Sequence, residues 1–250
     1  MFGYNHRHIL GKDIMRVGKS TKLHPRSGAN GARALDLNRD QVYEILLLDI
    51  ICGDLRPGQL VDEATLAEHY EEGRAGVRDA LYRLSMEGLV ERRPRLGSVI
   101  TDVSVRELEQ VFELRVQFEG RAAALAAQNA TPEEAAAIRN GYQGVEKVIV
   151  GADYRRLVQM DRAFHEAIAI ATHNIYLQRV MAMLNASALR FWHYALPRRA
   201  ESALREEIAA HLRVASEIER HDAAAAQKAM REVLDGFPAT VMGVFDFALK

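Results

Sequence analysis

An aspartate and a histidine lie one helical turn apart in the segment MDRAFHEAIA, residues 160–169. At about 100° of rotation per residue, Asp161 and His165 share a helix face with apolar neighbours. Those neighbours are Tyr154, Leu157, Val158, Phe164 and Ile168. Because a buried carboxylate without a partner costs several kcal/mol, the pair predicts a polar site inside the protein. Its remaining partners must come from other segments.

A second buried charge is expected at Arg115, which shares its predicted helix face with Leu108, Val111, Phe112, Phe118 and Ala122. A guanidinium in such surroundings needs a carboxylate. Two alternatives stay open: Arg115 pairs with Glu119, one turn further on, or it anchors an acidic ligand. A weaker polar row, Asn185, Arg190 and His193, follows in a later helix.

The distribution of charge is more informative than its sum. The 250 residues carry 33 Lys and Arg against 34 Asp and Glu, so net charge does not indicate nucleic acid. Residues 1–35, however, hold seven basic residues and one acid, and residues 74–95 hold six Arg and three acids. The intervening residues 36–73 hold ten acids and two Arg. Two positive segments therefore flank an acidic one.

Composition also bounds the compartment. A single cysteine, Cys52, excludes a disulfide framework and a thiolate metal cage. No apolar run is long enough to span a bilayer, and the first residues lack a secretory signal. We therefore expect a cytoplasmic protein without a membrane partner.

The periodicity predicts a mostly α fold in three parts. Residues 1–35 show no periodicity and are expected to be a flexible basic arm. Residues 36–102 predict three helices and a hairpin turning at RPRLG, the layout of a winged helix-turn-helix. Residues 103–250 predict a six- to seven-helix antiparallel bundle. Its helices are expected near 104–128, 131–149, 152–172, 174–195, 202–220 and 222–247.

Five segments carry a resemblance to a known family: GDLRPGQLVDEATLAEHY, RAGVRDALYRLSMEGLVERRPRLGSV, VFELRVQFEGRAAALAA, DRAFHEAIA and HDAAAAQKAMREVL. The chain resembles GntR family transcription regulators of the FCD type, whose C-terminal ligand-binding domain is all-helical. The resemblance implies a homodimer that binds operator DNA, most often as a repressor, and a small metabolite that changes its DNA affinity. Gly73 and Gly76 depart from the family, which usually has Ser and Pro there.

The predicted recognition helix places Arg74, Arg78 and Tyr82 at i, i+4 and i+8, beside its apolar face. Arginine is the usual bidentate reader of guanine in the major groove, and the resemblance puts DNA contacts at Arg74 and Arg78. Arg93, Arg95 and Gly97, at the hairpin tip, are expected to approach the DNA backbone or minor groove. The alternative is that Arg74, Arg78 and Tyr82 only form a solvent-exposed helix face.

The resemblance also implies a metal site. In metal-bearing members the ligands are an Asp, a His four residues on, a later His and a second His on the last helix. Asp161, His165 and His211 match, but the fourth position falls at Val233, which cannot coordinate. Three ligands can still hold zinc or a similar divalent ion, with water or a ligand carboxylate filling the gap. The competing account is a metal-free pocket in which these side chains bond each other and an effector.

We therefore expect a DNA-binding repressor controlled by an organic acid bound near Arg115, Asn185, Arg190 and His193. Two other functions are alternatives. An enzyme with an open metal site would activate water, but no general base stands out and the recognition helix would be unexplained. The other alternative is a constitutive architectural or interaction protein, whose pocket would bind no metal or metabolite.

Overall fold

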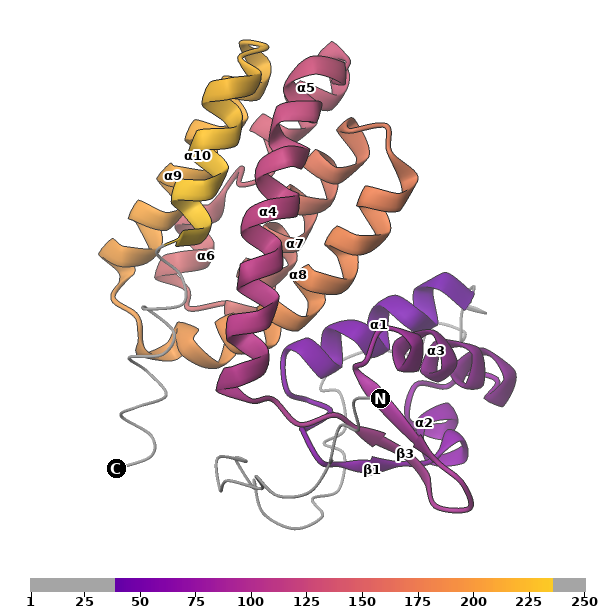
Figure 1. Cartoon of the computed structure of the whole chain (residues 1–250). Helices are drawn as coiled ribbons and strands as arrows, with labels where there is room; N and C mark the ends of the chain where they lie inside the picture. Colours follow the sequence, from indigo (N-terminus) through magenta and orange to yellow (C-terminus); the bar gives the residue numbers. More distant parts are fainter. Residues whose placement is uncertain (1–38, 236–250) are drawn as a thin grey trace, which may run out of the picture.

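The computed structural model describes residues 39–235. The predicted basic arm and the end of the last predicted helix, residues 236–247, lie outside the described residues. Within them the chain forms ten α-helices, one short 3-10 helix and three short strands. Figure 1 shows two groups of elements, a small one with the sheet and a larger helical one. The predicted fold, a winged helix-turn-helix followed by a helical bundle, is confirmed.

The N-terminal group is the winged helix-turn-helix. Its elements are α1 (Arg39–Ile51), β1 (Leu60–Val61), α2 (Glu63–His69), α3 (Arg74–Met86), β2 (Val90–Arg93) and β3 (Gly97–Ile100). Asp62 caps α2 by accepting hydrogen bonds from the backbone of Ala64 and Thr65. Gly73 begins α3 in an extended conformation and gives no side-chain cap.

The wing contains one strand more than the predicted hairpin. The sheet order is β1-β3-β2, antiparallel throughout, and Arg93 lies opposite Gly97 across the turn. The added strand β1 pairs Val61 with Ser98. A strand of two residues is too short to show an alternating pattern, so it could not be predicted.

The C-terminal group is the bundle. Its elements are α4 (Val105–Asn129), α5 (Pro132–Arg139), α6 (Val145–Val150), α7 (Tyr154–Ala171), α8 (Ile175–Ala195), η1 (Leu196–Arg198), α9 (Glu201–Glu219) and α10 (Ala223–Asp235). The long helix α4 packs against α7, α8, α9 and α10 (Figure 1). The single helix predicted over 131–149 is wrong. It is interrupted before α6, where Gly144 adopts a φ of 80° that a helix cannot contain.

Apolar faces of the expected spacing hold each group together. In α3, Val77, Ala80, Leu81 and Leu84 are buried, and α3 packs on α1. In the bundle, α7 buries Leu157, Phe164 and Ile168 together with the two polar residues Asp161 and His165. Among the helices of residues 39–235, none combines the length and apolarity that a bilayer crossing requires.

The two groups meet where α1 lies against the bundle. Arg162 of α7 pairs with Glu44 of α1 through both carboxylate oxygens, one contact measuring 2.9 Å. Arg155, two turns earlier in α7, contacts Asp49 at 2.5 Å and Asp54 at 2.6 Å. Two arginines of α7 thus pair with acidic residues in and just after α1. Part of the negative charge of residues 36–73 therefore serves to attach this domain to the bundle.

Two glycines of the winged helix-turn-helix predict opposite effects of adding a methyl group. A Cβ at Gly76, inside α3, would lie 3.7 Å from Cγ2 of Val42, an ordinary contact. Gly76→Ala should therefore raise the free energy of unfolding by about 0.5–1 kcal/mol. A Cβ at Gly97 would lie 2.8 Å from the Val61 carbonyl oxygen at a φ of 109°, so Gly97→Ala should cost about 1–3 kcal/mol. Urea unfolding followed by circular dichroism tests both, and shifts of the same sign would contradict the packing described.

Candidate functional site

The exposed side of α3 and the wing form one groove. Arg74 and Arg78 line it from α3, opposite the start of α2. The hairpin contributes Arg92, Arg93, Pro94, Arg95, Gly97 and Ser98. Five arginines therefore surround a groove that holds two acids, Asp62 and Glu63. Such a positive concave surface, formed by a helix and a wing, suits a polyanion.

The structure brings most of the predicted DNA residues to this groove. Arg74, Arg78, Arg93, Arg95 and Gly97 all line it. Tyr82 lies one turn beyond Arg78 on α3, outside the groove lining, and is 52% exposed. Arg92, which was not among the predicted DNA-binding residues, also lines the groove. The register of β2 places it there, and register was not readable before the turn geometry was known.

The groove arginines have weak carboxylate partners. Arg78 Nε lies 2.8 Å from Glu63 Oε2, and Arg92 approaches the other oxygen of Glu63 at 3.9 Å. Arg93 pairs with Glu91 at 2.9 Å. Exposed ion pairs of this kind contribute about 0–1 kcal/mol, so a phosphate or base edge can replace them. Gly97 has a structural role as well, because its missing side chain makes room for the carbonyl of β1.

The second site is a cluster inside the bundle. Asp161 and His165 from α7 and His211 from α9 are each at most 6% exposed. One candidate ligand atom from each residue lies within 4.8 Å of the others. The two Nε2 atoms are 3.3 Å apart, and Asp161 approaches them at 3.8 Å (His165) and 3.6 Å (His211). The predicted proximity of these three side chains is therefore present in the structure.

The outer nitrogens of both imidazoles have acceptors of their own. His165 Nδ1 lies 2.6 Å from Glu119 Oε2, and His211 Nδ1 lies 2.8 Å from the backbone carbonyl of Glu207. A proton on Nδ1 of His211 bonds the Glu207 carbonyl, and a proton on Nδ1 of His165 faces the Glu119 carboxylate as its charge partner. The Nε2 lone pairs are then left facing each other and the carboxylate of Asp161. Tyr142 adds one donor, its hydroxyl bonding Asp161 at 2.8 Å. Converging acceptors of this kind need a cation or a shared proton between them.

Burial and charge shift the two imidazoles in opposite directions. Burial by itself lowers the pKa of His165, but the carboxylates of Glu119 and Asp161 outweigh it, and the pKa of His165 is raised. Burial dominates at His211 and lowers its pKa to about 4. A proton held by the cluster would therefore reside on His165, with neutral His211 as its acceptor.

The guanidinium of Arg115 compensates Glu119, the buried acid behind His165. Arg115 pairs with Glu119 one turn along α4, and both side chains are at most 5% exposed. Burial raises the pKa of Glu119, yet the charges of Arg115 and His165 outweigh that effect and bring it to about 2. Of the two alternatives for Arg115, the structure shows the pairing with Glu119.

The cavity beside the cluster is very small. Its volume is about 10 Å³, and its walls include Arg115, Val233 and Leu234 together with the three cluster residues. That is about the space of one water molecule, so an ion or a water fits and an organic molecule does not. Val233 faces this space, which agrees with the fourth ligand position assigned to it by the resemblance.

The other predicted effector residues do not share that cavity. Asn185 lines a separate cavity between α7 and α8. Arg190 is turned to the connection between wing and bundle, where it donates to the Thr101 hydroxyl at 3.1 Å and to the Thr101 carbonyl. His193 is half-buried, and its burial lowers the pKa of its imidazole. The effector role of these residues stays a prediction.

Several contributing residues escaped the sequence analysis. Tyr142 lies between α5 and α6, where no periodicity marked it as buried. Arg155 and Arg162 looked like the polar face of an amphipathic helix. Their partners are in α1, more than a hundred residues earlier, which no local pattern reports.

Comparison with known proteins gives two family matches. Residues 38–100 match the bacterial regulatory proteins of the gntR family, and residues 110–236 match the FCD domain. The chain belongs to the GntR family of DNA-binding transcription regulators, in the group that carries an FCD domain. This membership excludes the enzyme alternative, because the family and the relatives named below are regulators.

Among its relatives, the uncharacterized HTH-type transcriptional regulator YdhC of Bacillus subtilis is 27% identical, over 75% of this chain and 84% of YdhC. A probable D-xylose utilization operon transcriptional repressor of Paenarthrobacter nicotinovorans is 28% identical, over 61% of this chain and 62% of that protein. The solved structure of E. coli McbR/YncC superposes with a TM-score of 0.74 at 22% identity, over 84% of this chain and all of that one. The likeness to McbR/YncC supports the fold.

The buried pair predicts a large stability cost at Arg115. Arg115→Leu leaves Glu119 buried with half of its compensation, which should lower the free energy of unfolding by about 3 kcal/mol. Arg121→Leu, at an exposed position of the same helix, should change it by less than about 0.5 kcal/mol. Urea unfolding measures both, and equal stability of the two variants would show that Arg115 has no structural role.

Proposed function

We propose that this regulator is a repressor that binds operator DNA as a homodimer in the cytoplasm and is released by a small organic acid. The groove of five arginines between α3 and the wing is the observation that carries the DNA-binding part. The DNA-binding domain is taken as residues 36–102 and the effector domain as residues 103–250. Two copies related by a two-fold axis would place two recognition helices on successive half-sites.

In this proposal α3 lies in the major groove. Arg74 and Arg78 reach base edges, and Tyr82, exposed further along the same helix, contacts the backbone or a base. Arg93 and Arg95 follow the phosphates or the minor groove, with Gly97 at the end of the turn. The exposure of these side chains and the weakness of their present ion pairs support the assignment.

Replacing a base-reading arginine should weaken specific binding. Arg78→Ala is expected to weaken binding to an operator obtained by in vitro selection by about 10- to 100-fold, the worth of one bidentate arginine–guanine contact. Fluorescence anisotropy at fixed salt measures the affinity. Arg220→Ala, whose side chain is 71% exposed at the end of α9, is the matched control and should bind normally. Undiminished binding by Arg78→Ala would contradict the groove assignment.

We further propose that Asp161, His165 and His211 hold a divalent cation, zinc or a similar ion. Three acceptor atoms that converge at a site of one-water size, with both imidazoles oriented by acceptors behind them, support this. A bound ion would supply a fixed positive charge that can attract a carboxylate. The chain's own residues orient the ligands, through Glu119 behind His165 and Tyr142 beside Asp161.

Changing the number of ligands should change metal content in both directions. His211→Ala removes one of three ligands and should abolish bound zinc, measured by elemental analysis after dialysis. Val233→His adds an imidazole where Val233 lines the cavity and should raise zinc affinity by about tenfold or more. Val233→Leu, which fills the same position without a donor, should not raise it. Unchanged metal content in His211→Ala would show that the ligand set is wrong.

A further inference from the structure

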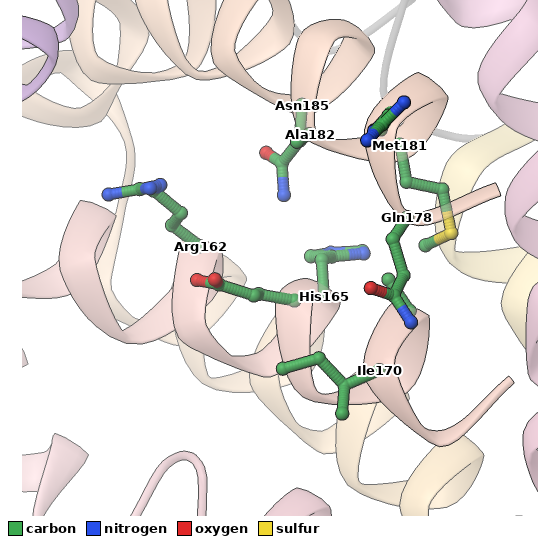
Figure 2. Close-up of a pocket in the computed structure, with 10 residues that line it drawn as sticks. Arg162, His165, Ile170, Gln178, Met181, Ala182 and Asn185 are labelled. Atoms are coloured by element: carbon green, nitrogen blue, oxygen red, sulfur yellow. The ribbon is translucent and has the colours of Figure 1, made fainter. Parts of the chain in front are cut away.

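A second, larger cavity lies between α7 and α8. Its volume is about 230 Å³, and it shares His165 with the cluster while extending away from it. Figure 2 shows Arg162, His165 and Ile170 on the α7 side and Gln178, Met181 and Asn185 on the α8 side. The volume is below that of a drug-sized pocket, so it suits a small metabolite.

The polar groups of this cavity are not all satisfied from within the protein. Asn185 is 5% exposed, and in the part of the chain that the structure describes its Oδ1 has no hydrogen-bond donor. Buried amide oxygens are nearly always paired, so an unpaired one that lines a cavity indicates a missing donor. Arg179, an exposed side chain, also lines the cavity, and among residues 39–235 no carboxylate is within ion-pair distance of it.

These groups define the chemistry of an occupant. Two guanidinium groups, Arg162 and Arg179, favour a carboxylate, which arginine binds in a bidentate manner. Asn185 Oδ1 requires a hydroxyl or amide hydrogen. Glu166, one helical turn after Arg162, also lines the cavity as a second acceptor and disfavours an occupant without donors. A small hydroxycarboxylate provides both kinds of group.

Arg162 connects this cavity with the DNA-binding domain. Its guanidinium is the partner of Glu44 in α1, at 2.9 Å from Glu44 Oε1, and the same side chain lines the cavity. A carboxylate that enters the cavity competes with Glu44 for the guanidinium donors. We propose that the cavity between α7 and α8 binds a small hydroxycarboxylate, and that its carboxylate draws Arg162 away from Glu44 and loosens α1 from the bundle. This inference rests on the proposed function, whose effector site it specifies.

Loosening α1 would reach the recognition helix directly. Tyr43 of α1 donates to Glu87, just after α3, at 2.8 Å, and Arg83 of α3 stacks over the Tyr43 ring at 3.9 Å. The helix α1 therefore moves with α3. Because ligand and Glu44 compete for one group, ligand binding and α1 docking oppose each other, and the coupling is reciprocal.

Calorimetric titration of the full-length protein tests the competition. The probes are L-malate, L-tartrate and D-gluconate, with succinate as the counterpart of malate without its hydroxyl. For whichever probe binds the unmodified chain, Arg162→Gln should lower the affinity by about tenfold or more. Glu44→Gln should strengthen it, because the competitor is removed. Arg155→Gln breaks the other α7–α1 pair without lining the cavity or freeing the Arg162 guanidinium, so its probe affinity should not fall and should rise less than in Glu44→Gln.

The hydroxyl contact has its own readout. Asn185→Leu should remove the preference for malate over succinate. If gluconate or tartrate is the probe that binds, Asn185→Leu should weaken its binding. No binding of any probe at millimolar concentration would overturn the ligand class. Weaker probe binding in Glu44→Gln, or unaltered binding in Arg162→Gln, would overturn the competition.

Operator binding separates the two levels of the account. If the unmodified chain binds its selected operator but no probe, the further inference fails and the proposed DNA-binding role stands. If it binds no operator, the proposed function fails, whatever the probes do.

Discussion

A carboxylate buried in α7 imposes the arrangement of the bundle. Asp161 accepts a hydrogen bond from the hydroxyl of Tyr142 and converges with the imidazoles of His165 in α7 and His211 in α9, so the three acceptors need a cation or a shared proton between them. His165 in turn faces Glu119 of α4. Glu119 is compensated by Arg115 one turn earlier. Each buried charge thus requires the next, and together they tie α4, α7 and α9 into one unit.

A neighbouring side of α7 carries the connection to the DNA-reading domain. Arg155 and Arg162 bind acidic residues of α1 and its following turn. Asp49, one of these acids, also accepts a hydrogen bond from Tyr70, between α2 and α3, at 2.5 Å. One helix therefore contacts both the buried cluster and the elements that position the groove, and a change at the cluster or beside it has a short path to α3.

Much of the fold could be predicted because its signals are local. The caps at Asp62 and Thr131 and the apolar face of α3 depend on residues a few positions apart. Asp161 and His165 were recognisable as buried because their neighbours on the same helix are apolar. Their meeting with His211 was implied by the family resemblance, not by any pattern within one helix.

The parts that could not be predicted depend on distant contacts. The interruption before α6 turns on Gly144, which is equally compatible with a helix end or a tolerated glycine. The partners of Arg155 and Arg162 lie in another domain, and the position of Arg92 depends on strand register. The predicted effector residues Arg190 and His193 lie on a polar row of α8 whose partners are in the wing connection and near α1. Periodicity shows that a side chain faces inward, but not which cavity it faces.

The central claim is that α7 couples the interior of the bundle to the domain that contacts DNA. Hydrogen–deuterium exchange of the full-length protein, with and without its selected operator, measures this coupling most directly. The account predicts slower exchange over residues 74–98, where the groove is covered, accompanied by altered exchange in α1 and in α7. Protection confined to residues 74–98, with α7 exchanging identically in both states, would contradict it.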